Sequence, residues 1–323
     1  MEMGSELCDE LVECFISMGV SCVSISGGEP TLHPRFWHAV GELSKNAVAV
    51  TVETNGTTLS RKNVRRLADY GTFGVSLSID SLDLGDYPVL GQKALTPQHL
   101  LDAIGWLRDA GINVRTSTVL VPGINNTREK AERLWETLDR LDVSVQCYSE
   151  VIPLGEGRNH ARDPDMFDLV AVLGKKIFGD RPSKGEERGG AGDPEAHVPC
   201  IECGTGIHRV ALAPDGRVSP CLQMTGLVAG GVPQESLEQI WETSEVFAFF
   251  RNKNNMESPI CRRCPDWRRC KGGCKVRAGL YGGVLAYPDL WSCATFGHVR
   301  RAKRLLTDAP TGQGSFRDVV KCV

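Results

Sequence analysis

The chain has 323 residues, of which 41% are hydrophobic and 24% are charged, and its formal net charge is -3. This composition is that of an ordinary globular protein, and the length allows more than one domain. Without an excess of positive charge, we expect no binding to nucleic acid or to a membrane surface. No apolar run approaches the roughly 20 residues of a spanning helix, and the polar N-terminus is unlike a signal peptide, so a cytoplasmic protein is expected.

The first half of the chain alternates between short β-branched runs and amphipathic segments. The expected strands are 21–26, 48–54, 74–80, 113–120 and 145–152, each bounded by turn residues. The expected helices between and after them are 34–45, 60–70, 97–110, 128–141 and 164–177. Strands separated by helices predict an α/β fold with a parallel sheet and right-handed crossovers.

The chain opens with a helical pattern at residues 5–19, and no strand pattern precedes it. A barrel of βα units begins with a strand, so the sheet is expected to lack its first strand. Composition then predicts four parts. They are a core over 1–178, a Gly-, Pro- and charge-rich linker over 179–199, a cysteine-rich domain over 200–295, and a helix with a polar tail over 296–323.

Thirteen cysteines are present, and eight of them lie between residues 200 and 293. In a chain without an export signal, metal ligation explains such crowding better than disulfides. Soft thiolates bind iron–sulfur clusters or zinc, and eight would serve two four-thiolate sites without remainder. The eight are Cys200, Cys203, Cys221, Cys261, Cys264, Cys270, Cys274 and Cys293.

The spacing favours clusters and leaves zinc as the alternative. Structural zinc sites usually show paired C-x2–4-C knuckles, whereas this set has one C-x2-C beside wider spacings. Nearby basic residues would offset the charge of thiolate clusters or form a solvated loop, and the sequence leaves both open; they are Arg262, Arg263, Arg268, Arg269 and Lys271. In contrast, Cys14, Cys22 and Cys147 lie on helix or strand patterns, where buried apolar side chains are expected.

A second motif, SISGGEP, follows the first expected strand. Gly27 and Gly28 allow a tight turn whose backbone approaches a ligand closely. The carboxylate of Glu29, before Pro30, would receive an amino group, or would cap the turn without any ligand.

These residues resemble a known family. The GGEP segment (27–30), ETNG (53–56) and SLSID (76–80), each at the end of an expected strand, resemble the radical S-adenosylmethionine (radical SAM) enzymes. The cysteines from Cys203 to Cys293 match the signature of the SPASM extension of that superfamily: C-x9–15-G-x4-C, then C-x2-C-x5-C-x3-C, then C. The resemblance implies a partial (β/α)6 TIM-like barrel that binds S-adenosylmethionine at the carboxyl ends of its strands.

The resemblance also implies cofactor contacts. Gly27, Gly28 and Glu29, with Pro30, would face the methionine amino group. Ser78 and Asp80, which share one face of a strand, would lie near the ribose with Asn55, and Arg115 would meet the carboxylate. For Ser78 and Asp80 the alternative is a pair that forms only the turn at the end of the strand.

For the cysteines, the family implies two auxiliary [4Fe–4S] clusters. The nearer cluster would use Cys203, Cys221 and Cys274, with Cys200 as the candidate fourth ligand or with an open coordination position. The farther cluster would use the remaining four, which are Cys261, Cys264, Cys270 and Cys293. In this arrangement Cys274 crosses over from its local group.

Two departures from the family shape the expected function. The C-x3-C-x2-C motif of the catalytic cluster is absent, and the spacing of Cys8, Cys14 and Cys22 does not replace it. The chain as written is therefore expected to be inactive, and an N-terminal extension of a few tens of residues would restore the motif and the first strand together. Leu222 stands where sulfatase-maturing relatives carry an Asp, which counts against that activity.

The predicted function is a maturase that modifies a peptide or protein substrate by radical chemistry. The resemblance implies an electron donor such as flavodoxin or ferredoxin. The alternatives are a non-catalytic iron–sulfur binding or electron-transfer protein and a zinc-stabilised binding module.

Overall fold

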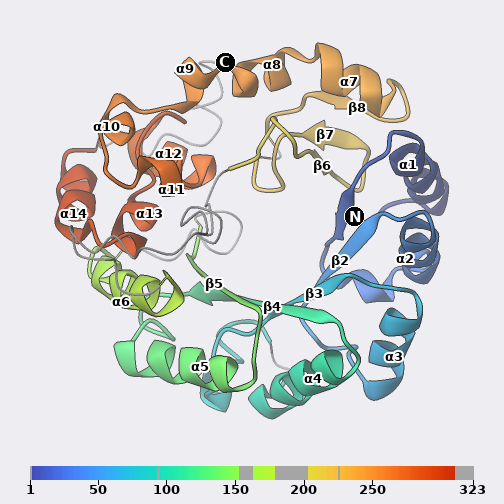
Figure 1. Cartoon of the computed structure of the whole chain (residues 1–323), viewed down its shortest axis with the longest axis horizontal. Coiled ribbons are helices and arrows are strands. Elements are labelled where there is room, and N and C mark those ends of the chain that lie inside the picture. The colour runs from blue at the N-terminus through green and yellow to red at the C-terminus, as the bar shows by residue number, and fades with distance from the viewer. Residues whose placement is uncertain (1, 93–94, 153–162, 179–202, 225, 310–323) are drawn as a thin grey trace, which may run out of the picture. The chain divides into compact units, whose positions relative to one another are not determined.

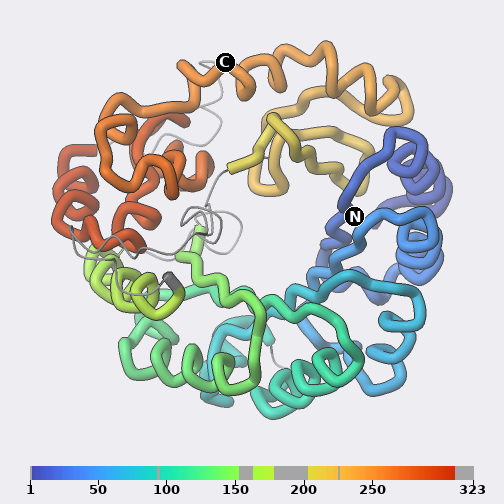
Figure 2. Tube along the Cα trace, in the orientation of Figure 1, coloured from blue at the N-terminus to red at the C-terminus, as the bar shows by residue number. Residues whose placement is uncertain are grey.

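The computed structural model describes residues 2–92, 95–152, 163–178, 203–224 and 226–309. The expected linker, the tail and Cys200 lie outside these residues. Two units can be separated, Met1–Arg162 and Asp163–Val323. Figure 2 traces the first unit from blue to green and the second from yellow-green to red. Each unit is described by itself.

A parallel sheet of five strands forms the centre of the first unit. The strands follow one another in the order β1-β2-β3-β4-β5, as the alternation of strands and helices predicts. All five expected strands are confirmed, within two residues at either end. They are β1 (Cys22–Ile25), β2 (Ala49–Thr54), β3 (Gly74–Ser78), β4 (Asn113–Leu120) and β5 (Val145–Glu150).

The helices of the first unit lie along one face of this sheet (Figure 1). The side chains of Ser60, Thr96 and Thr127 cap the amino ends of three of them, which explains where these helices begin. The helices are α1 (Ser5–Ser17), α2 (Phe36–Lys45), α3 (Arg61–Asp69), α4 (Pro97–Asp109) and α5 (Arg128–Arg140), with the short turns η1 (Pro30–Leu32) and η2 (Leu84–Asp86).

The two faces of the sheet differ in character. Alternate residues such as Val52, Leu77 and Val114 are buried in one continuous apolar core with the helices. The opposite face is polar, and the strand register aligns Glu53, Ser76 and Arg115 across β2, β3 and β4. One face therefore stabilises the unit, and the other is available for polar ligands.

The second unit combines a small antiparallel sheet with mostly short helices. The strands β6 (Ala211–Leu212), β7 (Arg217–Ser219) and β8 (Gly230–Gly231) pair in that order. The helices are α6 (Met166–Phe178), α7 (Leu237–Thr243), α8 (Glu245–Arg251), α9 (Lys253–Met256), α10 (Pro259–Arg262), α11 (Trp267–Cys270), α12 (Lys275–Gly282), α13 (Leu290–Thr295) and α14 (Val299–Thr307).

Helix α6, expected from its periodicity, packs against α13 and α14. A side chain at Gly174 would collide with the carbonyl oxygen of Thr295, so the close contact between α6 and α13 requires glycine there. The helix that the sequence places in the first domain thus lies in the same unit as the cysteines.

Candidate functional site

Four cysteines from three segments line one cavity in the second unit. Cys261 is on α10, Cys264 follows it, Cys270 ends α11, and Cys293 is on α13. These are the four residues assigned by resemblance to the farther cluster, and the structure brings them together.

The thiols of this set influence one another electrostatically. Burial raises the pKa of Cys270 to about 12, and repulsion from Asp289, Cys261 and Cys264 adds to the rise. Burial also raises the pKa of Cys293, with Asp289 and the other three cysteines of the set contributing. Without a cation these thiols resist ionisation, so the thiolate form needs a positive partner such as a metal.

Buried cationic groups lie around the same cavity. Lys275 is only 5% exposed, donates from Nζ to the Met256 carbonyl oxygen at 2.6 Å, and partly offsets the rise that burial causes in the pKa of Cys261. Arg269 stacks over the ring of Phe296, which lines the cavity, and its Nε is buried without a hydrogen-bond partner among the described residues. A buried cation and an unsatisfied donor beside clustered thiols fit a negatively charged metal–thiolate group.

The other cysteines form a second group. Burial raises the pKa of Cys274 to about 11, and repulsion from Cys203 contributes to that rise. Burial and the Cys203 thiolate likewise raise the pKa of Cys221. The Thr205 hydroxyl lies 3.0 Å from Cys203 Sγ and also hydrogen-bonds the Cys221 thiol. Cys203 thus interacts electrostatically with both Cys221 and Cys274, which is consistent with the group that the resemblance implies, while Cys200 lies outside the described residues.

Asp289 joins the two groups. Its fully buried carboxylate accepts hydrogen bonds from the Cys274 amide at 2.8 Å and from Ser292 Oγ at 2.6 Å. Burial alone would raise the pKa of Asp289, but the two-pronged ion pair with Arg277 outweighs this and holds the pKa below its usual range. The carboxylate thus holds the backbone at the start of α12. This is the point at which Cys274 separates from Cys270, its neighbour in the cysteine pattern.

Two polar residues of the cavity were missed by sequence reasoning. Asp266 and His298 line it together with the cysteines, and their side chains with Cys264 offer three ligand-type atoms within 4.8 Å of one another. Asp266 stands two residues after Cys264 and His298 five after Cys293, so proximity to cysteines was an available signal.

In the first unit, the carboxylate of Glu29 connects the ends of β1 and β2. One oxygen accepts from the Thr31 amide and hydroxyl, at 3.3 and 2.6 Å. The other accepts from the Thr54 hydroxyl at 2.7 Å and from the Asn55 amide at 3.0 Å. Both oxygens are therefore occupied within the chain, and Glu29 caps η1, which is the alternative that the sequence left open.

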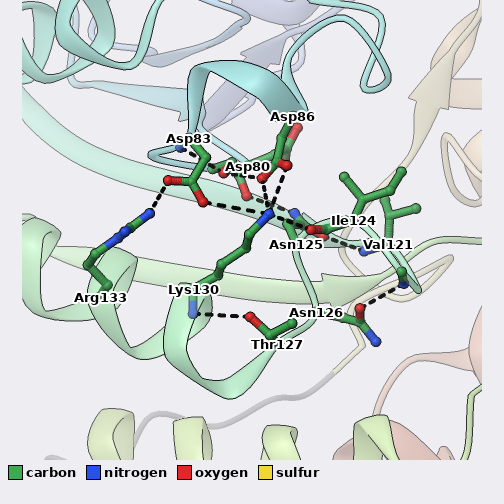
Figure 3. Close-up of polar contacts among 12 residues, drawn as sticks. Asp80, Asp83, Asp86, Val121, Ile124, Asn125, Asn126, Thr127, Lys130 and Arg133 are labelled. Atoms are coloured by element: carbon green, nitrogen blue, oxygen red, sulfur yellow. Dashed lines mark hydrogen bonds and ion pairs between the residues drawn. The ribbon is translucent and has the colours of Figure 1, made fainter.

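Asp80 connects the ends of β3 and β4 in a similar way. Its carboxylate accepts from the Val119 amide at 2.7 Å and from Gln92 Nε2 at 3.0 Å, and burial raises its pKa. Beside it, Asn125 donates to the carbonyl oxygens of Asp80 and Val119 (Figure 3). The Asp80 side chain is held inside this network.

The remaining predicted cofactor residues lie on or near the polar face. Gly27 and Gly28 are exposed, and a side chain at either would meet open space. Ser78 ends β3 half-buried, and Asn55 forms a turn by accepting from Thr57. Arg115 is exposed but lies in the first half of β4, in line with Ser76 and two residues before the Ser78–Ser117 pair. Ser78 and Arg115 therefore share the polar face but lie at different levels along the strands.

The strand and helix cysteines differ from the expectation of burial. Cys14 and Cys147 are half-buried, but Cys22 is exposed, so that prediction is wrong for Cys22. The reason is that β1 pairs with β2 alone among the described strands and turns alternate residues to the polar face.

Comparisons with known proteins bear on both units. A model of the radical SAM superfamily matches residues 2–134, and a model of the SPASM iron–sulfur cluster-binding domain matches residues 203–265. The chain is a radical SAM protein with a SPASM domain. The SPASM match ends before Cys270, so the last three cysteines of the pattern extend beyond it.

This radical SAM/SPASM protein has relatives that are similar over most of its length. The mycofactocin maturase MftC of Mycolicibacterium smegmatis is 24% identical over 331 residues, which cover 97% of this chain and 81% of that protein. The PqqA peptide cyclase of Streptomyces rochei is 26% identical, over 91% and 82% of the two chains. The solved structure of anSMEcpe with bound AdoMet has a TM-score of 0.64 at 16% identity and covers 99% of this chain and 89% of that one, which shows the shared fold. Among the described residues, no helix has the length and apolar character needed to span a membrane.

Proposed function

We propose that this radical SAM/SPASM protein is a maturase that modifies a peptide or protein substrate by S-adenosylmethionine-derived radical chemistry. The observation that carries the proposal is the presence of two groups of cysteines in the second unit, in a chain whose first unit offers a polar sheet face. Relatives named as a maturase and a peptide cyclase, similar over most of both chains, support the substrate class. A flavodoxin- or ferredoxin-like electron donor and a cytoplasmic location belong to the proposal as well.

The proposal assigns one [4Fe–4S] cluster to each cysteine group. Cys261, Cys264, Cys270 and Cys293 would hold one, and Cys203, Cys221 and Cys274 the other, with Cys200 as the candidate fourth ligand. When bound, these clusters supply electron transfer near the substrate. Lys275 and Arg269 would balance the charge of the first cluster, and Asp289 would hold Cys274 in place for the second.

The polar face of the first unit is the proposed site for S-adenosylmethionine, which supplies the hydrogen-abstracting group when bound. The open backbone at Gly27 and Gly28 fits close approach of a ligand. Ser78 and Arg115 would offer a hydroxyl and a cation from neighbouring strands. Glu29 and Asp80 hold the strand ends in register and would have to exchange an internal hydrogen bond in order to contact the cofactor.

Cysteine variants test the assignment of the two groups. After anaerobic loading with iron and sulfide, Cys203→Ala and Cys274→Ala should each lose the iron and sulfide of one cluster, and the double variant should lose no more. Combining Cys270→Ala with Cys274→Ala should remove both clusters. Cys147→Ala, from β5, is the matched control and should load like wild type. Equal losses in the two double variants would contradict the crossover of Cys274, and zinc without acid-labile sulfide would contradict the clusters.

A non-catalytic iron–sulfur protein is the second candidate. Two observations support it: the carboxylates of Glu29 and Asp80 are already hydrogen-bonded within the chain, and the sequence contains no C-x3-C-x2-C motif. The two candidates differ in the formation of 5′-deoxyadenosine under dithionite. This chain should form none, whereas an engineered product of it that carries the motif should form 5′-deoxyadenosine. If such a product binds S-adenosylmethionine but forms no 5′-deoxyadenosine, the maturase proposal fails and the second candidate stands.

A further inference from the structure

His298 and Asp266 form a polar pair in the wall of the four-cysteine cavity. Asp266 is 7% exposed, and the side chain of His298 is 17% exposed. Neither residue belongs to the cysteine pattern. A buried carboxylate and an imidazole beside four thiols need a physical reason, because burying polar groups costs free energy unless they are paired.

The geometry places one imidazole nitrogen between a carboxylate and a thiol. His298 Nε2 lies 2.7 Å from Asp266 Oδ2 and 3.5 Å from Cys264 Sγ. With a cluster bound, the Cys264 sulfur would accept hydrogen bonds, as a carboxylate does, so the nitrogen that lies between these two acceptors would be the donor. Its hydrogen would be shared between the two acceptors, as in other three-centre hydrogen bonds.

Backbone hydrogen bonds connect both members of the pair to the cysteines. The carbonyl oxygen of Asp266 accepts from the Cys270 amide at 2.9 Å, and the amide of His298 donates to the Cys293 carbonyl oxygen at 2.8 Å. The pair therefore moves with the cysteines and joins the α10–α11 segment to the end of α13. Such an arrangement holds the imidazole in one orientation toward Cys264.

We propose that His298, oriented by Asp266, is a positioning residue that donates a hydrogen bond to the Cys264 sulfur and sets the reduction potential of the cluster held by Cys261, Cys264, Cys270 and Cys293. This inference rests on the proposed function, because it requires a cluster at these cysteines. A hydrogen bond to a ligand sulfur withdraws electron density and favours the reduced cluster, so it raises the potential.

Direct ligation by the pair is the competing arrangement. The ligand-type atoms of Cys264, Asp266 and His298 lie close enough together to hold a metal ion. However, Cys264 would then be shared with the cluster, and the hydrogen bond of 2.7 Å between the imidazole and the carboxylate would have to break. The observations favour a donor to the ligand sulfur over a ligand to the metal.

The experiment measures the midpoint potential of the loaded full-length chain by a redox titration followed by electron paramagnetic resonance. A Cys203→Ala background leaves the four-cysteine cluster as the one observed. His298→Leu removes the N–H but keeps an apolar volume, and should lower the midpoint potential by about 60 mV, a tenfold change in the reduction equilibrium. His298→Gln retains an N–H near the same place and should recover part of the shift. His38→Leu, a histidine near Asp9 in the first unit, is the matched control and should not change the potential.

Three other results would contradict the inference. An unchanged potential in a fully loaded His298→Leu chain overturns the inference and leaves the proposed clusters intact. Loss of the cluster's iron and sulfide in both His298 variants makes His298 a ligand and also overturns it. A wild-type chain without acid-labile sulfide overturns the inference and the proposed function together.

Discussion

Gly273 shows how a single residue next to the cysteines controls their placement. It has a φ of +66°, and a side chain there would collide with Asp289 Oδ2 and Ser292 Oγ. Asp289 Oδ2 accepts the hydrogen bond of the Cys274 amide, and Ser292 Oγ of α13 donates to the same oxygen. Only glycine combines this backbone conformation with this lack of space.

Gly273→Ala is therefore expected to lower the iron and sulfide bound per chain, by displacing Asp289 from Cys274. Gly283→Ala is the matched control, since Gly283 has a φ of +73° but a side chain there would meet open space. Both variants carry the backbone strain of about 1 to 2 kcal/mol, and only the first adds the collision. Iron and acid-labile sulfide analysis after anaerobic loading measures the difference, and equal loading of the two variants would refute the role given to Asp289.

At the scale of elements, an ionic cluster attaches η2 to α5 (Figure 3). Lys130 Nζ donates to both carboxylate oxygens of Asp86 and to the Ile124 carbonyl oxygen, each at 2.8 Å, while Arg133 pairs with Asp83. Burial would raise the pKa of Asp86, but the hydrogen bonds from Lys130 and Ser81 outweigh it and lower the pKa. The cluster holds the loop that follows β3 next to Asp80.

Lys130→Met should reduce the local stability of this region by about 1.5 to 3 kcal/mol at pH 7, the range for a hydrogen bond to a charged group. Because the folded pKa of Asp86 is lowered, its contribution is present above the unfolded pKa of about 3.9 and is lost as the pH falls through the folded value. The deficit of the variant should accordingly shrink in strong acid, where the hydrogen bond from Lys130 to the Ile124 carbonyl oxygen remains. Hydrogen exchange of β3 and β4 peptides, corrected for the intrinsic rate at each pH, measures the difference in local stability between the variant and the wild type.

Lys45→Met provides the control for this prediction. Lys45 approaches Glu42 at 3.8 Å on α2, but its side chain is 75% exposed, so its removal should leave exchange unchanged. A deficit in Lys130→Met that persists undiminished in acid would show that packing of the lysine stem, and not the ion pair, holds η2.

Sequence patterns predicted the elements well because strands and helices have local periodicities. Hence β1 to β5 and the helices that follow them were expected at nearly their observed positions. The hydrogen-bond partners of Glu29 and Asp80 were not predictable, because they depend on which residues of the neighbouring strand lie opposite each carboxylate. The roles of Asp266 and His298 likewise depend on the contact between α11 and the start of α14, which no local pattern encodes.

The cysteines were an intermediate case. Their spacing predicted metal binding, and the family signature supplied the crossover of Cys274, which stays a prediction that agrees with the electrostatic interaction between Cys274 and Cys203. Local spacing alone would have grouped Cys274 with Cys270. The Cys274 backbone is held by Asp289, which is fifteen residues away in the sequence and which local spacing does not indicate.

At the scale of the whole molecule, the two units differ in what stabilises them. The first has a continuous apolar core between the sheet and helices α1 to α5. The second has strands of two or three residues and several helices of four residues around its cysteines. Elements this short gain little from their own hydrogen bonds, so metal binding is expected to contribute much of the folding free energy there.

Removing iron with a chelator under oxidising conditions should thus loosen the second unit selectively. Hydrogen exchange by mass spectrometry should show faster exchange in peptides from α10 to α13 of the stripped chain than of the loaded chain. Peptides from β2 and α4 serve as the internal control and should exchange equally in both, because their core contains no proposed metal ligand. Equal protection of α10 to α13 with and without metal would mean that packing alone maintains the cysteine groups. Faster exchange in both units would mean that the core of the first unit depends on the clusters of the second.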